Sequence, residues 1–237
     1  VAFGDSVLAD PDAGSYFAHR FDPSKVAGVD CPTSNNYAKR AGAKLRLPVR
    51  DFSCSGAVSM SPGPQVSQQV DAAIRSGALS PATNRVVITT GFNDTYNHRD
   101  MNLPQIRKQF ADRTAPQVER IKRAAPNARV QIVGYPTIGT GPYYCLFHFG
   151  PRPADSTFLP GIQDFENKAQ WMQVDLAART GVQFLDMKPS TRNNGMCADA
   201  NQRMWAGLVD FSAGDGNLPI HMNQRGHEHA ANVIARS

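Results

Sequence analysis

The chain has 237 residues, a length typical of one α/β domain that buries its core without a metal or a second subunit. Hydrophobic residues make up 41%, and 19 glycines with 17 prolines indicate a globular fold rich in loops rather than disorder. No apolar run approaches the length of a membrane span, so we expect no transmembrane segment.

The formal net charge is +5, and basic residues gather at 39–50 and 120–123. Solvated helix faces explain these clusters. A nucleic-acid-binding protein would show a longer basic stripe or interleaved aromatic residues, and neither is present, so we expect no nucleic-acid partner. Weak attraction to anionic membranes or cell-wall surfaces stays open.

Four cysteines lie far apart and none forms a C-x-x-C pair, which argues against a zinc site. An even number of cysteines in loops suggests two disulfides and an oxidising, extracellular compartment. Spacing alone leaves all three pairings open. The first residues form an apolar strand, which suggests a processed, secreted protein.

Short apolar runs and helical periodicities alternate along the chain. The predicted strands are Val1–Phe3, Leu47–Phe52, Arg85–Thr90, Val130–Val133 and Val182–Leu185. The predicted helices are 36–45, 65–74, a long helix from Leu103 that is bent or broken at Pro116, 163–180, and a last helix from Asn223. Residues 135–162 look like a long functional loop.

Most of these strands are apolar without alternation, as strands buried on both faces are. Strands that alternate with helices predict one parallel sheet covered by helices, in a single domain over residues 1–237. Ligands of such folds bind beyond the carboxyl ends of the strands.

Chemically useful residues follow three of the strands. Gly4-Asp5-Ser6 follows the first, Cys54-Ser55-Gly56 the second and Gly91-Phe92-Asn93-Asp94 the third, while His221 precedes the last helix. A serine hydroxyl needs a base, most often histidine. The backbone N–H groups of Ser6 and Gly56 and the Asn93 amide would serve as oxyanion donors.

Each of these groups alone has an ordinary explanation, as a turn, a cap or a solvated histidine. Their order and their shared position after strands carry the interpretation. Together they predict acyl transfer with Ser6 as nucleophile and His221 as base.

The four blocks resemble those of the SGNH hydrolases, also called GDSL lipases and esterases, in order and over nearly the whole chain. The resemblance implies a three-layer α/β/α sandwich with a five-stranded parallel sheet, a carboxylic ester substrate and no cofactor. It assigns the nucleophile to Ser6, the oxyanion donors to Ser6, Gly56 and Asn93, and the histidine to His221, followed by Gly226 as the family pattern expects.

The cysteines and their surroundings are similar to those of secreted actinobacterial members. That likeness implies the pairs Cys31–Cys54 and Cys145–Cys197. The match is partial, because Thr33 stands where those relatives frequently have arginine.

One position departs from the family. The acid usually found three residues before the histidine is Leu218 here, so another group must orient the imidazole. Some secreted members use a backbone carbonyl, and we expect the Leu218 carbonyl to accept the Nδ1 proton in a Ser–His dyad. The rival is the Asp215 side chain.

The remaining polar residues have structural interpretations. His227 and His229 lie two apart and face different sides of a helix, so we expect no metal site. We expect Asp5 to hold the turn of the nucleophile, and Asp94 and Asp186 to act as hydrogen-bonding residues at strand ends.

The substrate is less determined. The aromatic segment 143–147 either lines an acyl pocket or packs beside a disulfide. The absence of a long apolar lid helix favours soluble esters or short-to-medium acyl chains, while lipid esters stay open. We expect a monomer. The alternatives are an acyltransferase that uses the same site and an inactive binding module for acylated glycans or lipids.

Overall fold

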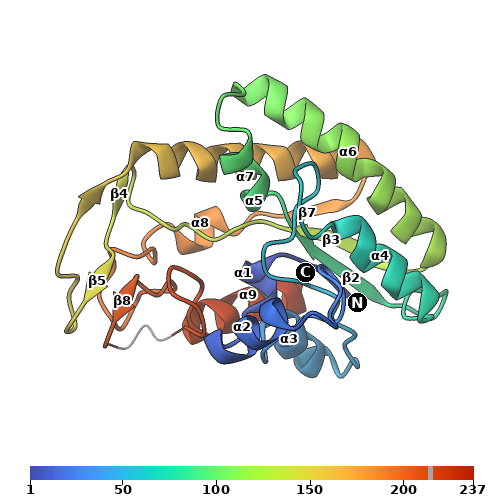
Figure 1. Ribbon diagram of the computed structural model, residues 1–237, viewed down its shortest axis with the longest axis horizontal. Coiled ribbons are helices and arrows are strands. Elements are labelled where there is room, and N and C mark those ends of the chain that lie inside the picture. The colour runs from blue at the N-terminus through green and yellow to red at the C-terminus, as the bar shows by residue number, and fades with distance from the viewer. Residues whose placement is uncertain (213–215) are drawn as a thin grey trace.

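The computed structural model describes residues 1–212 and 216–237. A parallel sheet of four strands runs through the middle of this part of the chain, with helices on both faces (Figure 1). The strand order is β1-β2-β3-β7. These strands are β1 (Ala2–Gly4), β2 (Arg85–Thr89), β3 (Arg129–Val133) and β7 (Gln183–Leu185). The predicted α/β class is therefore confirmed, but this sheet has four strands among the described residues and not the five that the family resemblance implies.

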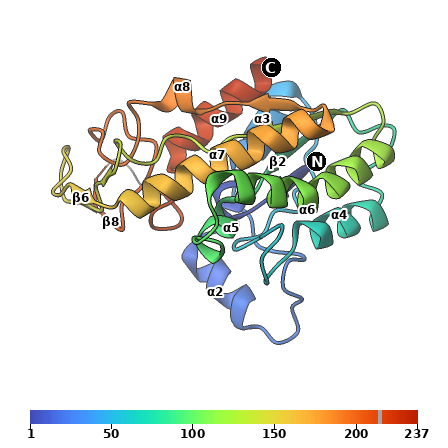
Figure 2. The same cartoon turned by 90° about the horizontal axis from the view of Figure 1, so that it is seen from above.

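The helices fall into two layers. Those described are α1 (Ser6–Ala9), α2 (Ala13–Phe21), α3 (Tyr37–Leu45), α4 (Val66–Arg75), α5 (Phe92–Asn97), α6 (Leu103–Ala124), α7 (Pro160–Thr180), α8 (Lys188–Thr191) and α9 (Gln224–Arg236). Figure 1 shows α3 and α9 under the sheet, and Figure 2 shows α4, α6 and α7 side by side on the other face.

Alternate side chains of the strands enter two different cores. Ala2 and Val87 pack with α3 and α9, whereas Phe3, Val86 and Ile88 pack with α4, α6 and α7. Because both faces are buried, the strands need continuous apolar runs, which is the pattern that the sequence displays.

Side-chain caps set the beginnings of several helices. Asn36 Oδ1 accepts from the N–H groups of Ala38 and Lys39 at the start of α3. Asn102 begins α6 in a reciprocal capping box, and Asn223 begins α9. The helices predicted at 36–45 and from Asn223 are therefore confirmed to within a residue or two.

The predicted strand Leu47–Phe52 is wrong as a full strand. Its only ladder contact among the described residues is an isolated parallel bridge between Ala2 and Asp51. The segment still runs along β1, since Ala2 N–H donates to Arg50 O at 3.0 Å and Phe52 N–H to Ala2 O at 2.9 Å. The segment does not form a full strand because Pro48 has no N–H to donate and because β1 offers only three residues for pairing.

The helix that we predicted to be bent or broken at Pro116 continues through it as α6. Pro116 is exposed, while Ala115, Val118 and Ile121 are buried in the core beside α7. Apolar packing on both sides of the proline therefore holds the helix together despite the lost backbone hydrogen bond.

The sequence pattern missed α2, α5 and several two-residue strands. The loop region 135–162 contains β4 (Tyr143–Tyr144), β5 (Phe147–His148) and β6 (Thr157–Phe158), and β5 pairs with β8 (Val209–Asp210). Helix α2 has no buried residue and projects from the body (Figure 2). None of the described helices is long and apolar enough to cross a membrane.

The carboxyl end of β1 is held by a buried glutamine. Gln69 of α4 accepts from Gly4 N–H at 2.9 Å and donates to Gly4 O at 2.8 Å. The same Gly4 carbonyl accepts from Cys54 N–H at 2.9 Å. An added Cβ at Gly4 would lie 2.3 Å from Thr89 O, so only glycine fits. This junction fixes the backbone directly before Ser6.

We predict that Gln69→Ala lowers the free energy of unfolding by about 3 kcal/mol. The substitution leaves the Gly4 N–H without its acceptor and opens a cavity in the core. Urea unfolding measures the loss. Exposed Gln202→Ala is the control, with an expected change within about 0.5 kcal/mol. Equal effects of the two substitutions would contradict the assigned role of Gln69.

Candidate active site

Ser6 stands on a tight turn between β1 and α1. Asp5 caps α1, its Oδ1 accepting from Val7 N–H at 3.0 Å, and its own N–H donates to Thr89 O at 3.1 Å. The turn places Ser6 in the first helical position, beyond the carboxyl end of the strand. Asp5 therefore holds the turn, as the sequence predicts.

The Asp5 carboxyl is buried and also accepts a hydrogen bond from the Tyr135 hydroxyl. Burial raises the pKa of Asp5 to about 7, although the hydrogen bonds from Tyr135 and Val7 oppose the shift. A carboxyl group with a raised pKa therefore lies directly before Ser6 in the chain.

The two ends of the chain meet at Ser6 and His221. The Nε2 atom of His221 lies 2.7 Å from Ser6 Oγ, and its Nδ1 lies 2.8 Å from the carbonyl oxygen of Pro219. Because a carbonyl only accepts, Nδ1 carries the proton and Nε2 accepts from the serine hydroxyl. Burial lowers the pKa of His221 below its ordinary value of 6.5, against the opposing effect of the Pro219 hydrogen bond.

The predicted partner of Nδ1, the Leu218 carbonyl, is wrong by one residue, because the Pro219 carbonyl occupies that place. Ile220 has a left-handed backbone with φ of 53°, which turns the chain so that the carbonyl two residues before His221 meets its ring. The rival Asp215 lies outside the described residues.

Backbone hydrogen bonds fasten the segment that carries His221. Ala206 N–H donates to His221 O at 2.8 Å, and Ile220 N–H donates to Gly207 O at 3.0 Å. Trp205 and Met222 form an antiparallel bridge beside them. The imidazole is therefore presented by a short ribbon that leads directly into α9.

The three predicted oxyanion donors line one pocket with Ser6 Oγ and His221. Within the described part of the chain, the N–H groups of Ser6 and Gly56 have no protein acceptor. Asn93 Nδ2 donates to Ala57 O at 2.9 Å, and Tyr96 OH donates to Asn93 Oδ1 at 2.6 Å. Tyr96 therefore fixes which way the amide points and leaves one Nδ2 hydrogen for a ligand.

The loop that carries Gly56 is anchored at both ends. Before Gly56, the disulfide Cys31–Cys54 joins it to another loop. After it, the buried Asp94 carboxylate accepts from three successive N–H groups at 2.8–3.0 Å and from one hydroxyl, those of Ser59–Ser61. Gly56 itself has φ of 79°, a conformation that favours glycine.

An apolar pocket of about 580 Å³ opens beside Ser6. Among the residues that line it are Ile138, Tyr144, Leu146, Leu159, Ile162, Met196 and Trp205. The aromatic segment 143–147 is predicted either to line an acyl pocket or to pack beside a disulfide. Both descriptions apply, because Tyr144 and Leu146 line the pocket and flank the disulfide-bonded Cys145.

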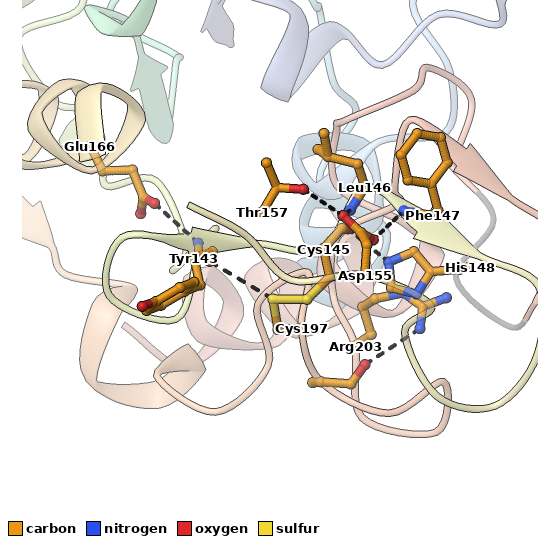
Figure 3. The surroundings of a disulfide bond; sticks show 12 residues. Tyr143, Cys145, Leu146, Phe147, His148, Asp155, Thr157, Glu166, Cys197 and Arg203 are labelled. Atoms are coloured by element: carbon orange, nitrogen blue, oxygen red, sulfur yellow. Dashed lines mark hydrogen bonds between the residues drawn. A yellow bond between two sulfur atoms is a disulfide. The ribbon is translucent and has the colours of Figure 1, made fainter. Parts of the chain in front are cut away.

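The disulfide Cys145–Cys197 (Figure 3) joins the two chain segments that carry Leu146 and Met196 of this pocket wall. Figure 3 also shows Asp155, which accepts from the N–H groups of Leu146 and Phe147 at 3.1 and 2.8 Å. Glu166 of α7 accepts from Tyr144 OH at 2.7 Å. The wall is therefore held by a covalent bond and two carboxylates. Both disulfide pairs are those that the family resemblance implies.

Two further histidines, His227 and His229, lie against polar side chains. His229 Nε2 lies 2.8 Å from Ser190 Oγ, and His227 is buried against Asp10. In the described residues, no group of three His, Cys, Asp or Glu side chains is arranged to hold a metal ion. Asp186 Oδ1 accepts from Lys188 N–H at 2.9 Å, which agrees with the structural role predicted for it.

A family model described as the GDSL-like lipase/acylhydrolase family matches residues 2–229. No curated protein sequence matches the chain. Solved structures with the same fold include phospholipase A1 from Streptomyces albidoflavus NA297, with 19% identity, TM-score 0.61 and coverage of 98% of this chain and 96% of that one.

Two further solved structures share the fold. An extracellular lipase from Streptomyces rimosus has 19% identity and a TM-score of 0.53, with coverage of 98% of this chain and 97% of that one. A carbohydrate acetylesterase from Sinorhizobium meliloti has 16% identity and a TM-score of 0.55, with coverage of 99% and 95%.

We predict that Asp94→Asn lowers the free energy of unfolding by about 2 kcal/mol, because an amide turns an N–H donor toward backbone donors that now face a carboxylate. The released loop should also displace Gly56 and slow ester turnover. Urea unfolding and an ester assay measure the two effects. Asp100→Asn, at an exposed carboxylate, is the control, and an unchanged Asp94→Asn protein would refute the anchoring role.

Proposed function

Because the chain belongs to the GDSL-like lipase/acylhydrolase family and is a carboxylic ester hydrolase, we propose that it works through an acyl-enzyme on Ser6 with His221 as general base. One observation carries the proposal: Ser6 Oγ and His221 Nε2 lie 2.7 Å apart while Nδ1 is held by a carbonyl. This is the geometry of a serine nucleophile paired with an oriented base.

In the first half of the reaction, Ser6 Oγ attacks the ester carbonyl and its proton passes to Nε2. The lowered pKa of His221 keeps the ring neutral near pH 7, so that it is ready to accept. The developing oxyanion receives hydrogen bonds from the N–H groups of Ser6 and Gly56 and from the Asn93 amide. The imidazolium then gives its proton to the leaving alcohol.

In the second half, water attacks the acyl-enzyme and loses a proton to Nε2, and the acid product leaves as Ser6 recovers its hydrogen. The Pro219 carbonyl holds the Nδ1 proton throughout. A carbonyl carries less negative charge than a carboxylate, so it stabilises the imidazolium less strongly. Its main contribution is to fix the tautomer and the orientation of the ring.

We assign the apolar pocket to the acyl group of the substrate. Its wall of aliphatic and aromatic side chains suits a hydrocarbon chain and offers few partners to a sugar. The names of the similar structures include a phospholipase and a lipase, which supports an ester of an apolar acid. We propose that the chain acts as a single secreted domain and a monomer, with its two disulfides formed in an oxidising compartment.

The alternative hypothesis of an inactive binding module is supported only by the absence of an acid at position 218. The imidazole has a hydrogen-bond acceptor in Pro219, so the departure from the family pattern does not leave the base without orientation.

We predict that Ser6→Ala abolishes turnover of p-nitrophenyl esters and labelling by an organophosphonate. Asn93→Ala should lower kcat about 10²–10³-fold, because one oxyanion donor is lost, while labelling of Ser6 continues. Exposed Asn201→Ala is the control and should behave like the parent protein. Full activity of either site variant refutes the role assigned to that residue.

We predict that Asp215→Asn changes kcat by less than about tenfold, since the Pro219 carbonyl already accepts the Nδ1 proton of His221. The same p-nitrophenyl assay measures it, with Ser6→Ala as the baseline. A fall approaching the ~10⁴-fold loss known for a missing triad acid would replace the Ser–His dyad by a triad.

A further inference from the structure

Asp10 ends α1 one helical turn after the nucleophile. Its backbone is left-handed, with φ of 47° and ψ of 46°, and its side chain is buried. Few L residues adopt this conformation, and aspartate does so more readily than most. Burial of a carboxylate is costly unless hydrogen-bond donors surround it, so a buried aspartate requires donors close to its oxygens.

Every described partner of the Asp10 carboxylate is a donor. Oδ2 accepts from Ser34 Oγ and from Asn217 Nδ2, both at 2.9 Å. His227 Nε2 lies 3.1 Å from the same oxygen. Because His227 Nδ1 accepts from Tyr37 N–H, its Nε2 carries the proton of the neutral ring. Donors therefore surround Asp10 Oδ2, whereas Oδ1 has no protein partner among the described residues.

Asn217 connects this carboxylate to the catalytic segment. Its Nδ2 also donates to the Asp10 backbone carbonyl at 2.9 Å, so one amide grips both the main chain and the side chain of Asp10. Four residues later comes His221, and between them stand Pro219 and the left-handed Ile220. Pro219 and Ile220 are exposed, and the segment is attached after them by Ile220 N–H to Gly207 O and before them by the Asn217 amide.

The charge of Asp10 also reaches His221. Two titratable side chains of the described residues bear on the ring through space: Asp10 at the end of α1 raises the pKa of His221, and His227 of α9 lowers it only when its own ring is protonated. Both effects are smaller than that of burial, which sets the lowered pKa. The sign for Asp10 is that of a buried anion that favours the imidazolium.

We propose that Asp10 is a positioning residue that replaces the absent acid before His221, holding the histidine segment through Asn217 and stabilising the imidazolium without touching the ring. The proposal rests on Ser6 and His221 acting as nucleophile and base. The proposal explains why an aspartate stands at a position with left-handed backbone conformation, four residues after Ser6.

The tether is tested with Asn217→Ala, which removes both hydrogen bonds to Asp10 and leaves the Asp10 charge in place. We predict that kcat falls about tenfold, as one lost hydrogen bond to a charged group implies, with KM within about twofold because the acyl pocket is untouched. Asn127→Ala is the matched control, since Asn127 Nδ2 holds a remote loop through Pro81 O at 2.9 Å.

The charge is tested with Asp10→Asn, which keeps the shape of the side chain. Loss of the anion lowers the pKa of His221, so the acidic limb of the kcat/KM profile should move to lower pH. Asn217→Ala should leave that limb in place. Because burial raises the pKa of Asp5 to about 7, the profile of Asp5→Asn is measured as well, to separate the contribution of this carboxyl from that of His221.

Three outcomes overturn the proposal: Asn217→Ala as active as Asn127→Ala, an acidic limb unmoved by Asp10→Asn, or a loss approaching ~10⁴-fold in Asp215→Asn. If Asp10→Asn does not fold, Asn217→Ala still decides the tether, because its altered side chain is only half-buried. An active Ser6→Ala variant would instead refute the proposed function itself, so the two failures are distinguishable.

Discussion

The site depends on how the end of β1 is fastened. The Gly4 carbonyl accepts from Cys54 N–H and from the Gln69 amide, and the next N–H, that of Asp5, donates to Thr89 O. These bonds join the segment that ends before Gly56, the strand that ends before Asn93 and the turn that carries Ser6. Hydrogen bonds at the sheet edge thus set the spacing of the three segments that carry the proposed oxyanion donors.

The architecture and the main site could be read from the sequence because each rests on local pattern. Buried parallel strands need apolar runs, and the residues after them share one edge of the sheet, so the sequence predicts that Ser6, Gly56 and Asn93 lie together, as they do around one pocket. The features that the sequence did not predict depend instead on contacts between residues that are distant in the chain. Helix α6 continues through Pro116 because of its packing, and residues 47–52 lie beside β1 with a single bridge rather than a full strand.

The His221 partner illustrates the limit most clearly. The sequence shows that an acid is missing, yet which carbonyl turns toward the ring depends on the left-handed conformation of Ile220, a β-branched residue in which no pattern predicts it. Asp10 was missed for a related reason. Its partners Ser34, Asn217 and His227 are distant in the chain and meet only when α1, α9 and two loops pack together.

The disulfide beside the pocket that we assign to the acyl group has a wider consequence. Tyr144 and Leu146 flank Cys145 in the chain, and Met196 directly precedes Cys197. A covalent staple thus sets the spacing of the backbone from which these three side chains project. Exchanging one of them would reshape the cavity while the scaffold stays in register, so evolution can retune the preferred acid by single substitutions without rebuilding the fold.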